Sequence, residues 1–225
     1  MRVIASLAVW LLLTGTNAPG QVSTEPAHLL MPGGFQTRTR PELGNQEWFG
    51  VYATPTGHEL RRTLVTVEDT PYGCRGSGRK ISAQGSATPL FLVAGLPGLK
   101  AGPIDTAFEG RRFVHPGESI PLKLNEGGWY TLEGFGTARP GVGGVDFREY
   151  QVVLRIGDHR QILQTYPRVN VDAPPRLLWA GDIDRDNRVD LLQGHDVYHY
   201  VLFLSSIAKP GDLVAQAAIF RSHSC

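Results

Sequence analysis

Residues 150–166 read YQVVLRIGDHRQILQTY, and this stretch decides the fold class. Every second residue from Tyr150 to Ile156 is apolar, and two of the three residues between them are polar, which is the period of a half-buried strand. Gly157-Asp158 is a turn pair, and apolar residues return over 161–166. The stretch therefore predicts two antiparallel strands joined by a tight turn, a β-hairpin.

Short segments of strand-like composition recur on both sides of this hairpin. The candidates are residues 47–52, 64–68, 90–93, 119–124, 129–135, 176–180, 189–192, 198–205 and 213–221. The alanine-rich last segment also suits a helix, but its short length favours a strand. Pro121 predicts that its segment lies at a sheet edge, and residues 70–82, which carry Cys74, are expected to form a loop. With 27 glycines and 16 prolines to make turns, the sequence predicts an all-β, β-sandwich-like fold.

The amino terminus has the pattern of a secretory signal peptide over residues 1–20. A basic start precedes the apolar run of residues 3–13, and small residues follow. Since a membrane-spanning helix needs about 20 apolar residues, this run is too short to serve as one. We therefore expect a secreted or periplasmic protein, with no membrane span in the mature chain.

The mature chain divides by composition into three parts. Residues 21–46 are polar and proline-containing, and they are expected to form an extended lead-in. Residues 47–172 are expected to form a β domain. The Pro174-Pro175 pair marks the start of the third part, residues 173–225, a β segment that packs on this domain or belongs to it.

Cys74 and Cys225 are the two cysteines of the chain. An even number of cysteines in an exported protein favours a disulfide, with two free buried thiols as the alternative. A bridge between them would stabilise the fold by about 5 kcal/mol in the chain-entropy model. The net charge of +1, from 22 basic and 21 acidic residues, gives no reason to expect a nucleic-acid or membrane surface.

Residues 181–190 read GDIDRDNRVD, the one stretch whose residue types and spacing together specify a chemistry. Its four aspartates occupy positions 1, 3, 5 and 9 of a calcium-loop pattern. Position 7 is Arg188, which would contribute its backbone carbonyl, and Asn187 at position 6 tolerates the left-handed backbone needed there. The pattern predicts Ca²⁺ held by Asp182, Asp184, Asp186, the Arg188 carbonyl and Asp190.

A solvated acidic turn is the alternative interpretation of this loop. Four carboxylates within nine residues repel one another and need a counter-charge. Arg185 and Arg188 could supply that charge without any ion. Position 12 is Gln193, so the bidentate glutamate of an EF-hand is absent, and the flanking residues are strand-like. The sequence therefore favours a calcium loop framed by strands over an EF-hand.

The run DIDRDNRVDLL resembles the calcium loop of FG-GAP (VCBS-type, integrin α-like) repeats, in which Asp-x-Asp-x-Asp-Gly-x-x-Asp-Leu precedes a short strand. Residues 178–182, 202–206 and 208–211, with the terminal Cys225, are also similar to the ends of uncharacterised exported bacterial proteins. The resemblance is confined to residues 178–225. It implies Ca²⁺ ligation by the residues named above and no catalytic activity, and one copy cannot form a propeller.

Three other groups of residues could carry chemistry. His195, Asp196 and His199 form a cluster after the loop, but on a strand the two histidines would lie about 13 Å apart. A pair among Glu118, Glu126, Glu133 and Glu149 could act as glycosidase carboxylates. Trp48, Trp129 and Trp179 could line a sugar-binding face or fill the core.

Two functions remain from the sequence. The first is a calcium-binding β protein with a binding or structural role, whose partner is a protein or a glycan. The second is a secreted hydrolase that uses the histidine cluster or a carboxylate pair. The sequence favours the first function, because the calcium loop is present in the chain whereas an enzyme requires a proximity that spacing does not supply.

Overall fold

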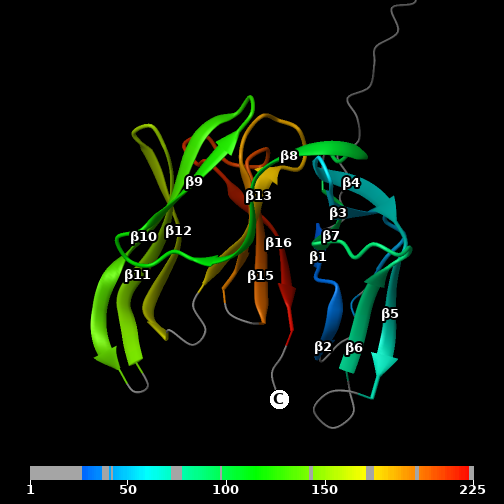
Figure 1. Cartoon of the computed structure of the whole chain (residues 1–225), viewed down its shortest axis with the longest axis horizontal. Coiled ribbons are helices and arrows are strands. Elements are labelled where there is room, and N and C mark those ends of the chain that lie inside the picture. Colours follow the sequence, from blue (N-terminus) through cyan, green and yellow to red (C-terminus); the bar gives the residue numbers. More distant parts are fainter. Residues whose placement is uncertain are drawn as a thin grey trace, which may run out of the picture.

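The computed structural model of the chain describes residues 27–36, 41, 43–71, 78–96, 98–141, 144–170, 175–195 and 198–222. Within these residues the chain forms strands and no helix (Figure 1), so the all-β prediction is confirmed. Accordingly, none of the described residues belongs to a helix that could cross a bilayer. The expected signal peptide over residues 1–20 and both cysteines lie outside the described residues.

The strands follow one another along the chain with short connections. They are β1 (His28–Leu30), β2 (Gly33–Gln36), β3 (Trp48–Thr54), β4 (Gly57–Thr63), β5 (Val65–Thr70), β6 (Gly78–Ala83), β7 (Phe91–Ala94), β8 (Gly102–Phe113), β9 (Ser119–Leu124), β10 (Gly128–Gly141), β11 (Gly144–Ile156), β12 (His159–Asn170), β13 (Arg176–Asp182), β14 (Asp190–Gly194), β15 (His199–Leu204) and β16 (Ala215–Arg221). A nine-stranded sheet has the order β1-β7-β3-β4-β8-β13-β14-β15-β16. A four-stranded sheet has the order β12-β11-β10-β9, and a three-stranded sheet the order β2-β6-β5.

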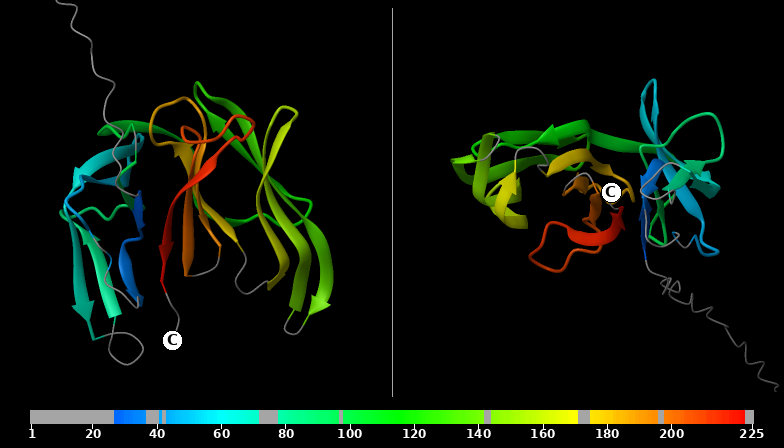
Figure 2. Two further views of the ribbon diagram at one scale, coloured as in Figure 1. Left: turned by 180° about the vertical axis from the view of Figure 1, so that it is seen from behind. Right: turned by 90° about the horizontal axis from the view of Figure 1, so that it is seen from below.

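The nine-stranded sheet is nearly closed, because its two end strands, β1 and β16, lie in contact with each other (Figure 2). Its interior is a hydrophobic core to which the first and the last strands, β1 and β16, both contribute. Phe91 from β7 and Trp179 from β13 meet there edge to face, with ring centroids 5.4 Å apart. The core is thus built from strands that are far apart in the sequence.

The four-stranded sheet packs against the outer face of β13–β16 and forms a second core (Figure 1). Neighbouring residues of one strand therefore serve different cores: Leu191 and Val201 face the four-stranded sheet, whereas Leu192 and Leu202 face the interior of the large sheet. Strands that are buried on both faces carry continuous apolar runs, as β15 does over residues 200–204. The two packed sheets give the predicted sandwich-like layering.

The hairpin at residues 150–166 is confirmed and is longer than the alternating stretch. β11 and β12 pair from Ile156↔His159 at the turn to Asp146↔Asn170 at the far end. β9 lies at the edge of this sheet, as Pro121 predicted.

Five strands, β1, β2, β4, β6 and β8, lie outside the segments that the sequence predicted as strands. β4 follows the turn at residues 55–57 and pairs with β3 and β8. Residues 78–83, expected within a loop, form β6 because both of its edges find partners, β2 and β5. β8 was not predicted. It pairs first with β4 and then with β13, and so joins the two halves of the large sheet. Within the expected lead-in, β1 and β2 pair with β7 and β6.

Candidate metal centre

The aspartate loop connects β13 to β14, whose pairing Gly181↔Asp190 holds the two ends of the loop together. The chain turns between them through two left-handed residues, Arg185 at φ 64° and Asn187 at φ 62°. The left-handed position expected at Asn187 is present. A left-handed conformation costs about 1–2 kcal/mol for a residue with a side chain. The loop therefore holds a backbone that its surroundings must stabilise.

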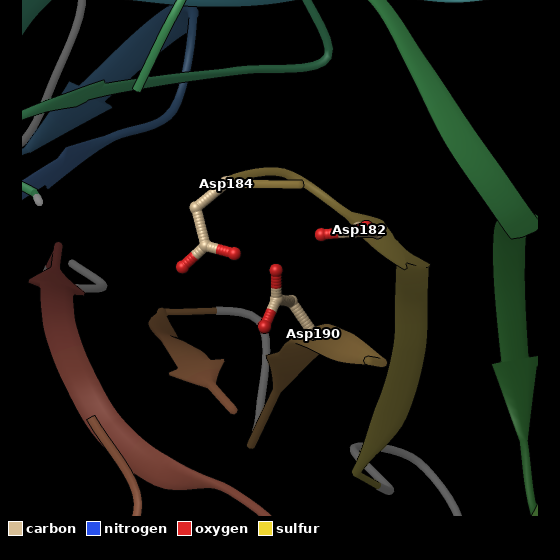
Figure 3. Close-up of side chains that lie close together, drawn as sticks. All are labelled: Asp182, Asp184 and Asp190. Carbon is tan, nitrogen blue, oxygen red and sulfur yellow. The ribbon is translucent and has the colours of Figure 1, made fainter. Parts of the chain in front are cut away.

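Three carboxylates point toward one another inside this loop (Figure 3). Asp182, Asp184 and Asp190 each offer one oxygen, and these oxygens all lie within 4.8 Å of one another. Oxygens bound to one Ca²⁺ at 2.3–2.6 Å are separated by at most about 5 Å when they lie on opposite sides of the ion. The three side chains can therefore hold a single metal ion. They are the one such group of His, Cys, Asp or Glu found within the described residues.

Backbone N–H groups and serine hydroxyls fix these carboxylates. Asp182 accepts hydrogen bonds from the backbone N–H of Asp186 at 3.0 Å and of Asn187 at 2.8 Å. Asp190 is fully buried and accepts from the N–H of Ile183 and of Ser205, each at 2.9 Å. The side chains are thus oriented before any ligand binds.

Asp184 differs from the other two because one of its oxygens has no protein partner. Its Oδ2 accepts a hydrogen bond from the Ser206 hydroxyl. Its Oδ1 is buried, and no described residue donates to it. A buried acceptor left without a donor costs about 1–3 kcal/mol. This atom fits a metal ligand, because a bound cation would satisfy it.

The electrostatics of the cluster would also favour a bound cation. Burial raises the pKa of Asp182 and Asp184, with smaller contributions from neighbouring carboxylates. Burial, followed by repulsion from Asp184, raises the pKa of Asp190 well above its ordinary value. All three charged forms are therefore disfavoured in the metal-free protein. A bound cation would reverse this effect.

Asp186, the fourth predicted ligand, lies beside this group and pairs with an arginine. Its carboxylate accepts from the Arg188 guanidinium at 2.7 Å and from the backbone N–H of Arg188 at 2.9 Å. The Arg185 guanidinium donates to the backbone carbonyl of Lys100 at 2.9 Å. The two arginines therefore bind Asp186 and the Lys100 carbonyl. The alternative interpretation, an acidic turn neutralised by its own arginines, holds for Asp186 but not for the three grouped carboxylates.

Neighbouring segments enclose the loop closely. A Cβ added at Gly127, in the turn between β9 and β10, would overlap the carbonyl oxygen of Asn187. A Cβ at Gly98 would lie 3.4 Å from the Cβ of Asp184. Ser205 and Ser206 approach from the end of β15. Sequence reasoning missed these serines, because only the pairing of β14 with β15 brings them to the loop.

The remaining candidates do not form a comparable site. The backbone N–H of His195 donates to the backbone carbonyl of His199 at 2.8 Å, and Asp196 lies outside the described residues. Glu133 pairs with Arg155 at 2.7 Å across two strands of the four-stranded sheet.

The tryptophans serve two different surroundings. Trp48 and Trp179 belong to the core, whereas 62% of Trp129 is exposed.

No family model matches the chain, and neither a curated protein nor a solved structure gives a significant match to it.

Proposed function

We propose that the protein is a secreted or periplasmic calcium-binding β protein with a binding or structural role, whose ion is held by Asp182, Asp184 and Asp190. The observation that carries this proposal is the buried Oδ1 of Asp184, which lacks a donor and belongs to a group of carboxylate oxygens within 4.8 Å of one another. Export rests on the signal-like residues 1–20. The loop would act as a single FG-GAP-type calcium loop outside a propeller.

Ca²⁺ suits this group better than Mg²⁺ does. The donors are carboxylate oxygens, which are hard ligands and suit both ions. Mg²⁺ requires distances of about 2.0–2.1 Å and a near-ideal octahedron, so its opposite ligands lie about 4.2 Å apart. Ca²⁺ takes six to eight oxygens in a flexible arrangement, which water, Asp186 and the Arg188 carbonyl would complete.

The ion would stabilise the junction between the two packed sheets. The loop is in contact with the β9–β10 turn through Gly127 and with the end of β15 through Ser205. An ion present at 100 times its Kd adds about 2.7 kcal/mol to the free energy of unfolding. We therefore expect calcium to stabilise the fold and to fix the surfaces around the loop for a protein or glycan partner.

Calorimetric titration of the purified protein with Ca²⁺ and with Mg²⁺, combined with thermal melts in Ca²⁺ and in EDTA, tests this proposal. We expect binding of one Ca²⁺, weaker binding of Mg²⁺, and a melting temperature several degrees lower in EDTA. Asp184→Ala should abolish both effects. Asp158→Ala is the matched control, because Asp158 is an exposed aspartate in the β11–β12 turn. Equal melting temperatures in Ca²⁺ and EDTA, with no binding heat, would refute the proposal.

A further inference from the structure

The four-stranded sheet has one covered face and one open face. Strands β13–β16 cover its inner face, and no other described segment lies over its outer face (Figures 1 and 2). On the outer face Trp129 is 62% exposed, Ile162 55% and Phe135 38%. Exposed apolar residues that occur singly are ordinary, whereas a cluster of them marks an interaction site.

Strand register gathers these side chains into one patch. Trp129 stands opposite Lys123 of β9. Farther along β10, Glu133 stands opposite Val153, which in turn stands opposite Ile162 of β12. Val153 lies on the open face and is nevertheless fully buried, because the side chains around it cover it. The patch is therefore continuous across all four strands.

Positive charges are interleaved with the apolar groups of this patch. The Lys123 ammonium lies 5.2 Å from the centre of the Trp129 ring, and the Arg160 guanidinium lies 5.2 Å from that of Phe135. Arg155 lies on β11, between the strands that carry Lys123 and Arg160, and it forms an ion pair with Glu133. Three cations against one carboxylate give the patch an excess of positive charge, although the whole chain has a net charge of only +1.

We propose that this outer face of β9–β12 binds a linear acidic polysaccharide. Trp129, which is 62% exposed, offers apolar ring surface for the C–H face of a sugar ring. Lys123 and Arg160 lie over the rings of Trp129 and Phe135, where they can pair with carboxylates or sulfates carried by neighbouring sugars. Aromatic rings with adjacent cations thus match a ligand that alternates apolar ring faces with negative charges.

Two other classes of partner fit the patch less well. Four strands about 4.8 Å apart and the seven residues from Trp129 to Phe135, at about 3.4 Å each, give roughly 460 Å², little more than half of the ~800 Å² that each partner buries in a stable protein complex. A nucleic-acid-binding domain has a pI above about 9, whereas the pI of this chain is about 7.9. A linear acidic polysaccharide, which is narrow and moderately charged, remains the best match.

Affinity electrophoresis of the purified protein through gels that contain a polysaccharide provides the test. The probes are hyaluronan, which carries carboxylates, heparin, which carries sulfates as well, and neutral dextran. We expect retardation by one or both acidic probes and none by dextran, and the responding probe identifies the anionic group. Trp129→Ala, and separately Lys123→Gln with Arg160→Gln, should weaken binding about tenfold. Leu64→Ala is the matched control, because Leu64 is 68% exposed outside this sheet.

Several outcomes would overturn the proposal. These are no retardation by either acidic probe, equal retardation by dextran, or binding that Trp129→Ala leaves unchanged. Tighter binding of poly(dT) than of the glycans would assign the face to nucleic acid. A dimer in light scattering that Trp129→Ala dissociates would assign it to a second copy of the chain.

The inference does not rest on the metal proposal, and the two can fail separately. Each gel is run in EDTA and in Ca²⁺. Binding in EDTA by a protein that shows no Ca²⁺ heat would retain the glycan face and reject the metal site. A Ca²⁺ response without glycan binding would do the reverse.

Discussion

The Asp190 carboxylate accepts two hydrogen bonds from Ser205, one from the backbone N–H at 2.9 Å and one from the hydroxyl at 3.0 Å. The two residues lie at the start of β14 and just beyond β15, so this contact joins the metal loop to the far end of a paired strand. The same hydroxyl lies 2.9 Å from Asp186. Because it has one hydrogen, it can donate to only one of the two carboxylates at a time.

Replacing this hydroxyl should weaken both the fold and the site. Ser205→Ala keeps the backbone bond to Asp190 and removes the hydroxyl bond. A hydrogen bond to a charged group contributes about 1.5–3 kcal/mol, so we expect a loss of about 2 kcal/mol in the free energy of unfolding measured by urea titration in Ca²⁺, where a bound cation would keep Asp190 charged. Calcium affinity should fall as well.

The control for Ser205→Ala is Ser82→Ala, because the Ser82 hydroxyl bonds to an exposed threonine. That substitution should change stability by less than about 0.5 kcal/mol. Similar losses in both variants would show that the Asp190–Ser205 contact has no special role.

Asp184→Asn should stabilise the metal-free protein and abolish its response to calcium. The amide oxygen can keep the bond from Ser206, and the amide N–H groups can donate to the carboxylates of Asp182 and Asp190. This exchange removes one charge and satisfies the atom that now lacks a partner. We expect a gain of about 1–2 kcal/mol in EDTA.

Urea titrations in EDTA and in Ca²⁺ measure both halves of this prediction. Asp158→Asn, in an exposed turn, should change neither quantity. A destabilised Asp184→Asn protein in EDTA would contradict the view that the metal-free carboxylates are in conflict.

The response to pH should differ between the metal-free and calcium-loaded proteins. The raised pKa values of Asp182, Asp184 and Asp190 mean that the folded state binds protons more tightly than the unfolded state. The resulting stability is fully present below the unfolded pKa and is lost as pH rises through the folded pKa values. The cluster should therefore stabilise the metal-free protein increasingly as the pH falls from 7 toward about 4.

Calcium reverses the sign of this effect, because protons compete with the ion for the same carboxylates. The increase in melting temperature produced by calcium should shrink over the same range. Melts at several pH values, in Ca²⁺ and in EDTA, measure both trends. Asp184→Asn is the reference, because it removes one titrating carboxyl and leaves the other acids of the protein in place. An identical pH profile for both proteins in EDTA would exclude Asp184 as a contributor.

Gly127→Ala should disturb the loop from the neighbouring sheet. The added Cβ would overlap the carbonyl oxygen of Asn187 and press on Leu124. Overpacking of this kind costs about 1–3 kcal/mol. We expect a loss of that size in urea titrations and weaker calcium binding in calorimetry.

Gly34→Ala is the matched control for this glycine. Nothing lies within 4 Å of a Cβ at Gly34, and its backbone is not left-handed. Equal tolerance of alanine at both positions would mean that the β9–β10 turn does not press on the metal loop.

The amino-acid sequence determined the parts of the protein that depend on neighbouring residues. The alternation of residues 150–156 and the turn pair that follows produce a hairpin, because the period of two and the turn chemistry act within a few residues. Aspartates spaced two apart and the left-handed Asn187 are likewise local properties of the metal loop.

The tertiary structure decided which side chains meet. The Asp190–Ser205 contact and the exposure of Trp129 depend on the pairing and packing of strands distant in the chain. β8 escaped prediction because only one of its 12 residues is buried, so its sequence lacks a clear alternation. The spacing of residues within one segment does not show which strands pair. In strands that are buried on both faces, the alternation of apolar and polar residues is also lost.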